Sequence, residues 1–209
     1  MSCSSRCASP VPGDTRAPCP RRRAVAIWFG AGLLPFAGAA RARSTPPAAV
    51  VRALGTPRLA GGGVFRWWGL EVYRASLWVG PAGLDSDDLG AQPFALQLHY
   101  ARSLRGRAIA DESTRLIDRL DLGSTAQRRA WQARMRAIFP DVHAGDSLTG
   151  LYLGPTDGGA RTDFLLDGHA IGSIGGRTFA VAFFSIWLSR HSAAPELRRA
   201  LLAGARPTP

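Results

Sequence analysis

Two arginines and three aromatic residues lie close together between residues 66 and 74, where they could bind an acidic, apolar ligand. The segment contains Arg66, Trp67, Trp68, Tyr73 and Arg74. A guanidinium forms charge-assisted hydrogen bonds with a carboxylate, and aromatic rings can line the apolar part of a pocket. In an enzyme, Arg66 and Tyr73 would be the groups that polarise a substrate. The alternative is that Arg66 is a solvated turn residue and that both tryptophans belong to the core.

Metal, cofactor and nucleophile sites have little support in the sequence. The four histidines lie in different segments, with no pair at the spacing of metal ligands: His99, His143, His169 and His191. The three cysteines all precede residue 20, and the sequence contains no G-x-S-x-G motif. The glycine-rich segment 172–176 lacks the lysine of a phosphate-binding loop. We therefore expect neither a metal nor a cofactor.

The candidate residues lie in a stretch, residues 59–80, whose composition predicts two β-strands. Three consecutive glycines at 61–63 can adopt positive φ and are expected to allow a tight reversal of the chain. In the second strand, alternation places Val72, Arg74, Ser76 and Trp78 in one row, and Tyr73, Ala75, Leu77 and Val79 in the other. Neither row is purely polar. We therefore expect this strand to be covered on both faces or to line a cavity.

The remaining segments predict strands, then helices, then strands and helices again. Strands are expected at 94–100, 147–153, 161–166 and 169–174, with Asp-Gly at 167–168 forming a hairpin turn. Two helices are expected between Ser103 and Pro140, the first capped by Ser103 and the second by a Ser124–Gln127 capping box. A buried helix is expected at 178–188, and a short one begins at Pro195. This order predicts an α+β fold with an antiparallel sheet.

Residues 1–42 have the pattern of a secretory signal. Three arginines at 21–23 precede an apolar run that ends in small residues, and cleavage could follow Ala39 or Ala42. A single membrane anchor is the alternative, but Gly32, Pro35 and Gly38 shorten the apolar helix. We predict a flexible mature N-terminus at 43–53, one domain at 54–204 and a tail at 205–209. The expected location is the periplasm or outside the cell, with no stable membrane span after removal of the leader.

The basic charge of the chain does not indicate nucleic-acid binding. The formal net charge is +11, but the chain contains no lysine, and all 26 basic residues are arginine. Residues 43–209 hold 20 arginines against 14 acidic residues, a balance of +6, and these arginines are scattered. A nucleic-acid interface would concentrate basic residues on one face or along one helix. We therefore expect no nucleic-acid partner.

The ordered set of segments resembles the bacterial chalcone-isomerase-like proteins. The segments that carry the resemblance are VYRASLWV, PFALQLHY, WQARMRAIFPDVHAGD, FLLDGHAIGSI and FAVAFFSIWLS, between about residues 54 and 202. The resemblance implies an open-faced β-sandwich, a large antiparallel sheet with helices packed on one side. It also implies a ligand cleft between the hairpin and the helices.

The isomerases of this superfamily position their substrate with an arginine, a threonine, a tyrosine and an asparagine. In the resemblance, Tyr73 takes the place of the threonine, and Arg66 is the nearest candidate for the arginine. The chain contains no asparagine, and residues 105–120 contain no tyrosine. Since each positioned donor is commonly worth a few kcal/mol to catalysis, the isomerase polar network is not expected here.

Three functions follow from these observations. The first is an exported, non-catalytic protein that binds a small apolar or fatty-acid-like ligand through Arg66, Trp67, Tyr73 and Arg74, in a cleft beside the hairpin. The second is an intramolecular lyase or isomerase acting on an unknown substrate through Arg66 and Tyr73. The third is an interaction protein of the cell envelope whose cleft is filled by side chains.

Overall fold

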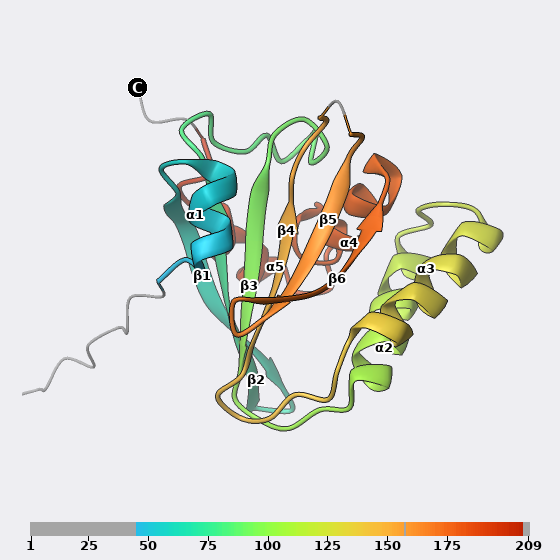
Figure 1. Ribbon diagram of the computed structural model, residues 1–209. Helices are drawn as coiled ribbons and strands as arrows, with labels where there is room; N and C mark the ends of the chain where they lie inside the picture. The colour runs from blue at the N-terminus through green and yellow to red at the C-terminus, as the bar shows by residue number, and fades with distance from the viewer. Residues whose placement is uncertain (1–44, 157, 207–209) are drawn as a thin grey trace, which may run out of the picture. The chain divides into compact units, whose positions relative to one another are not determined.

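The computed structural model describes residues 45–206 apart from residue 157, and it contains one antiparallel sheet of six strands. The strands are β1 (Arg58–Trp67), β2 (Leu70–Val79), β3 (Phe94–Tyr100), β4 (Ser147–Tyr152), β5 (Arg161–Leu166) and β6 (His169–Gly175). Each strand pairs with the next one in the chain, so the sheet order is the sequence order (Figure 1). The predicted α+β class and antiparallel sheet are confirmed.

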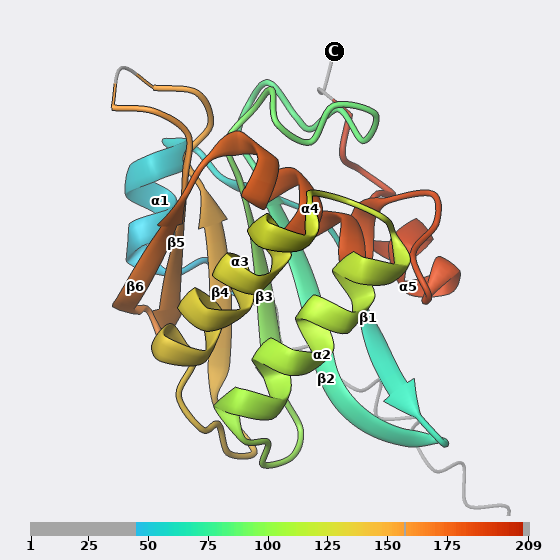
Figure 2. The same ribbon diagram turned by 90° about the vertical axis from the view of Figure 1, so that its right-hand side faces the viewer.

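Five helices pack against this sheet. They are α1 (Ala48–Leu54), α2 (Gly106–Arg119), α3 (Thr125–Ile138), α4 (Arg177–Leu188) and α5 (Pro195–Leu201). Helices α2 to α5 share one hydrophobic core with the inner face of the sheet, which Figure 2 shows from the helix side. Helix α1 packs on the outer face, in a smaller cluster around Trp78. The open face expected from the family resemblance is therefore partly covered.

Helix α4 is the centre of the main core. Phe179, Phe183 and Phe184 are buried, and Phe183 contacts Phe164 of β5 with ring centroids 5.3 Å apart. The predicted buried helix is confirmed. The apolar stripe of α3 also packs into this core through Trp131 and Met135.

The three glycines of β1 do not form the reversal that the sequence predicted. Residues 61–63 lie inside the strand without positive φ, and the chain reverses at Trp68 and Gly69, with φ of 51° and 77°. The glycines instead allow α5 to approach β1 closely. A Cβ built on Gly61 would lie 2.0 Å from the carbonyl oxygen of Ala200. A larger residue there would displace the backbone of α5.

The two predicted rows of β2 face opposite sides of the sheet. Ala75, Leu77 and Val79 are buried against the helices, whereas Trp78 is buried in the cluster with α1. The prediction that β2 is covered on both faces is confirmed for this half of the strand. It does not hold near the turn, where Leu70 is 54% exposed.

Two helix caps show what local sequence can and cannot predict. The Ser124–Gln127 capping box of α3 is present, with Gln127 N donating to Ser124 Oγ and Ser124 N donating to Gln127 Oε1. The predicted Ser103 cap of α2 is wrong, because the N-cap residue is Arg105. Asp141, 35 residues downstream, accepts a hydrogen bond from Gly106 N at 2.9 Å. A side chain from a distant loop therefore satisfies this helix end.

The predicted ends of the domain also need correction. The segment 43–53, predicted to be flexible, contains most of helix α1, whose residue Val50 is fully buried. Ala205, assigned to the tail, is buried, and its carbonyl oxygen accepts a hydrogen bond from Leu84 N. The predicted signal at 1–42 lies outside the described residues. Within residues 45–206, no helix is long and apolar enough to cross a membrane.

Candidate ligand-binding site

The inner face of the β1–β2 hairpin carries an aromatic cluster. The ring of Tyr73 stacks on Phe65 at 5.1 Å and meets Tyr100 of β3 edge to face at 5.9 Å. Trp187, near the end of α4, donates a hydrogen bond from Nε1 to the Tyr73 hydroxyl at 3.0 Å. Strand alternation points Tyr73 toward the helices, and the end of α4 brings the indole to it.

Both tyrosines of this cluster are neutral at physiological pH. Burial raises the pKa of Tyr73 to about 12, although the hydrogen bond from Trp187 acts in the opposite direction. Burial also raises the pKa of Tyr100 above its ordinary value. A neutral phenol can donate a hydrogen bond to a ligand oxygen but cannot act as a base near pH 7.

The two arginines of the predicted site lie on the outer face of the hairpin. Arg66 pairs with Glu71 across the two strands, and their side chains form an ion pair at 3.6 Å. Arg74 Nε forms a second ion pair with the same carboxylate at 2.9 Å. Tyr73 points to the inner face, so the structure does not bring its hydroxyl together with the Arg66 guanidinium. The structure therefore gives no support to the two-residue arrangement of the isomerase hypothesis.

Neither tryptophan near the turn is buried. The exposed fraction is 61% for Trp67 and 88% for Trp68, so the alternative that both belong to the core is wrong. The four predicted ligand residues, Arg66, Trp67, Tyr73 and Arg74, thus divide between the outer face, the turn and the inner face. The structure does not bring them around one cavity, and their role in ligand binding stays a prediction.

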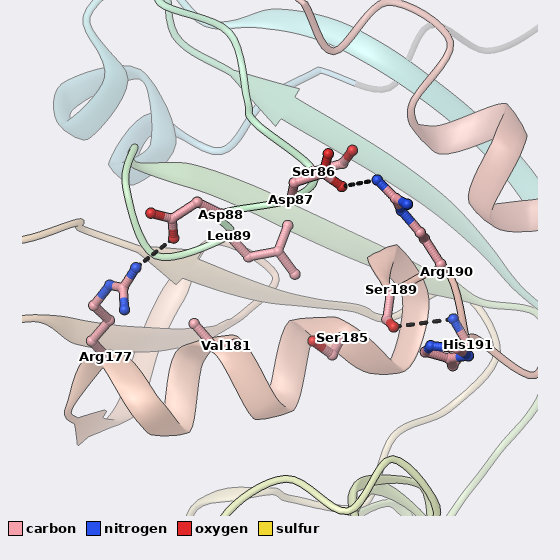
Figure 3. A pocket seen from close by; sticks show the side chains of 10 residues that line it. All are labelled: Ser86, Asp87, Asp88, Leu89, Arg177, Val181, Ser185, Ser189, Arg190 and His191. Carbon is pink, nitrogen blue, oxygen red and sulfur yellow. Dashed lines mark hydrogen bonds and ion pairs between the residues drawn. The ribbon is translucent and has the colours of Figure 1, made fainter.

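A polar groove lies between the loop before β3 and helix α4. Its volume is about 520 Å³, and its lining includes Asp87, Asp88, Arg177, Ser185 and His191. Figure 3 shows two ion pairs that tie the loop to the helix, Arg177 with Asp88 and Arg190 with Asp87. Because these charges satisfy one another, the groove offers few unpaired groups to a ligand.

A smaller and more apolar recess lies between the end of α2 and the turn after α4. Its volume is about 240 Å³, and it is lined by Leu116, Arg119, Leu120, Ile186, His191, Ser192 and Ala193. The Ser192 hydroxyl donates to the Ile186 carbonyl oxygen at 2.7 Å, so this polar group is already satisfied. Arg119 is exposed and forms no ion pair with any described residue. The recess therefore combines apolar walls with one uncommitted guanidinium.

Helix α4 contributes one residue to the recess and one to the aromatic cluster. Ile186 lines the recess, and the next residue, Trp187, donates to Tyr73. Sequence reasoning missed Arg119 and Trp187. The recess at Arg119 depends on how α2 packs against α4, and the bond from Trp187 to Tyr73 depends on how α4 packs against the sheet. Tyr100 had one local signal, its place in the alternating strand 94–100. Among the described residues, no group of three or more histidine, cysteine or acidic side chains could hold a metal ion.

Comparison with known proteins identifies the family. The family described as chalcone isomerase-like matches residues 47–203, about three quarters of the chain. The chain belongs to the chalcone isomerase-like family. The crystal structure of a fatty-acid binding protein of Arabidopsis thaliana is similar in fold, with a TM-score of 0.58. The two sequences are 14% identical, and the similarity covers 71% of this chain and 88% of the plant protein. No curated protein matches the chain.

Membership of the chalcone isomerase-like family makes the missing polar groups informative. The superfamily resemblance implies an arginine, a threonine, a tyrosine and an asparagine around the isomerase cleft. This chain has no asparagine, α2 has no tyrosine, and Arg66 lies on the outer face of the hairpin. Tyr73, which takes the place of the threonine, is a neutral phenol on the inner face, and its oxygen accepts a hydrogen bond from Trp187.

Proposed function

We propose that this protein binds a small amphiphilic ligand of the fatty-acid type without transforming it. The observation that carries the proposal is the recess between α2 and α4, whose apolar walls end at the uncommitted guanidinium of Arg119. An apolar tail would contact Leu116, Leu120 and Ile186, and a carboxylate would meet Arg119. Burial of apolar surface supplies most of the affinity, and the charge-assisted hydrogen bond fixes the orientation of the ligand.

Two further observations support binding over catalysis. The polar network of the isomerases is absent, and a crystal structure with a similar fold is that of a plant fatty-acid binding protein. The proposed site lies between the end of α2 and the turn after α4. It does not use Arg66 or Arg74, because Glu71 already pairs with both guanidiniums.

The first experiment asks whether a ligand accompanies the protein. The full chain is purified, analysed by native mass spectrometry and extracted with organic solvent. We expect a bound mass that corresponds to an amphiphilic acid, or saturable binding of cis-parinaric acid to the stripped protein. A protein that carries no ligand and does not bind this probe would contradict the proposal.

The second experiment locates the site with matched arginine variants. Arg119→Gln should weaken cis-parinaric acid binding by about tenfold, since a charge-assisted hydrogen bond is worth roughly 1.5–3 kcal/mol. The control is Arg129→Gln on α3, which removes the same charge from another exposed position without an ion pair to a described residue. Equal loss in both variants would mean that only net charge matters, and the recess would not be the site.

We also propose that the protein is exported after cleavage following Ala39 or Ala42. The arginine-flanked apolar run and the small residues after it support this proposal. Fractionation of expressing cells and N-terminal sequencing would test it. A product that stays in the cytoplasm and still contains the predicted leader, with Trp28 as its marker, would contradict it.

A further inference from the structure

Three apolar side chains are gathered at the end of the β1–β2 hairpin. We call Trp67, Trp68 and Leu70 the tryptophan tip; their exposed fractions are 61%, 88% and 54%. The other large hydrophobic residues exposed within 45–206, Val51 and Leu59, lie on α1 and near the start of β1. Clustered exposed apolar groups mark interaction sites far more often than scattered ones do.

The backbone of the tryptophan tip is unfavourable for the residue that it holds. Trp68 and Gly69 form a two-residue turn in which both have positive φ. Such turns favour asparagine, aspartate or glycine at both positions, and a bulky residue at positive φ is strained. Aromatic stacking does not offset this strain, since neither Trp67 nor Trp68 stacks on another ring among the described residues. A contact outside the chain would account for a tryptophan at this position.

Positive charge surrounds the tryptophan tip. The side chains of Arg66 and Arg74 are 55% and 63% exposed, and Glu71 is the one acid on the outer face between them. Ala101 N donates a hydrogen bond to Val72 O at 2.9 Å, which brings the exposed Arg102 next to the hairpin. Among Arg66, Glu71, Arg74 and Arg102, three guanidiniums face one carboxylate, so the outer face of the hairpin near the turn is basic.

We propose that the tryptophan tip anchors the protein to the surface of a membrane rich in anionic phospholipid. Indole rings favour the boundary between headgroups and acyl chains, and arginines near the surface are attracted to anionic lipid. Figure 2 shows the ends of β1 and β2 turning away from β3, so the turn that joins them projects from the sheet. A projecting set of aromatic and basic groups fits a lipid surface better than it fits a protein pocket. This inference goes beyond the proposed function and does not require an occupied recess.

Vesicle flotation tests the anchor with matched variants of the full chain. The vesicles contain phosphatidylcholine with or without phosphatidylglycerol. The tip variant is Trp67→Ser with Trp68→Asn, and the control is Val51→Ser with Leu59→Ser, which removes two exposed apolar residues elsewhere. We expect the tip variant to lose at least about tenfold in partitioning to anionic vesicles, and the control to bind like the wild type. Wild-type binding should fall in pure phosphatidylcholine and at high salt.

Fluorescence shows whether the indoles themselves enter the lipid. Brominated acyl chains should quench part of the wild-type tryptophan emission, and the tip variant should lose that quenching. Trp68→Asn alone serves as a second variant, because asparagine suits this turn and the protein should fold at least as well as the wild type.

Two results would overturn the anchor. Equal flotation and equal quenching of the wild type and the tip variant would place membrane binding elsewhere in the chain. Loss of self-association in analytical ultracentrifugation, with unchanged flotation, would make the tryptophan tip a contact between two copies of the protein.

Discussion

The two ends of the β1–β2 hairpin have opposite surroundings although they belong to the same pair of strands. At the base, α5 lies against the glycines of β1, and Leu77 and Val79 are completely buried. At the other end, Trp67, Trp68 and Leu70 extend into solvent and the turn is strained. The base uses its smallest residues where packing is tight, and the turn places large apolar residues where they stay mostly exposed. We infer that the base maintains the fold, whereas the turn serves an interaction outside the domain.

Gly61→Ala is expected to have the largest effect, because it would disrupt the packing of α5 against the base of the hairpin. Its Cβ would lie 2.0 Å from Ala200 O and 2.6 Å from Leu201 O, both backbone atoms that cannot rotate away. We expect a loss of about 3 kcal/mol in the free energy of unfolding, measured with urea. Gly175→Ala on β6 is the matched control, since nothing lies within 4 Å of its added Cβ. Equal stability of the two variants would disprove the close approach of α5.

The middle of the hairpin should respond to alkaline pH. The pKa of Tyr73 rises from 10 in the unfolded chain to about 12 in the folded protein, so the unfolded chain releases its proton first as the pH increases. Stability is therefore fully present below pH 10 and falls between about pH 10 and 12, by roughly 3 kcal/mol from this group.

Tyr73→Phe should reduce that alkaline slope, and the raised pKa of Tyr100 should sustain the rest. At neutral pH, the same variant should lose about 1 kcal/mol, because Trp187 Nε1 is left without its partner. Tyr100→Phe is a useful comparison, since the Tyr100 hydroxyl makes no hydrogen bond to the described residues and its removal should cost less at pH 7. Urea titrations of both variants at about pH 8 and pH 11 would measure the difference. An unchanged slope in Tyr73→Phe would exclude Tyr73 as its source.

The smallest expected effect concerns the turn and has the opposite sign. Trp68→Asn replaces a strained tryptophan by a residue suited to positive φ, and should stabilise the protein by about 1 kcal/mol. The same change should weaken binding to anionic vesicles. A variant that is less stable than the wild type would show that Trp68 contributes to packing after all.

Features that depend on neighbouring residues could be predicted from the sequence, and features that depend on distant ones could not. The Asp167–Gly168 turn and the Ser124–Gln127 capping box each arise within a few residues, and both are present. The glycines at 61–63 allow the close approach of α5, which lies about 140 residues later in the chain. Without knowledge of that contact, three consecutive glycines indicated a turn. Likewise, Asp141 could not be recognised as the partner of the α2 N-terminus before the two loops were brought together.

In the candidate site, too, local features could be predicted from the sequence and contacts between distant segments could not. Alternation correctly separated Tyr73 from Arg74, but it could not show that Trp187 would reach the Tyr73 hydroxyl. The recess around Leu116 and Arg119 is created by the packing of α2 against α4, and no single segment contains its pattern.

The order of assembly follows from the position of α5. Every strand can pair with its sequence neighbour as soon as that neighbour is available, yet the helix that packs closely on the glycines of β1 is α5, at residues 195–201. A chain that is still being synthesised can therefore build most of the sheet while its glycine-rich first strand stays uncovered. Folding is complete only after the last helix has emerged.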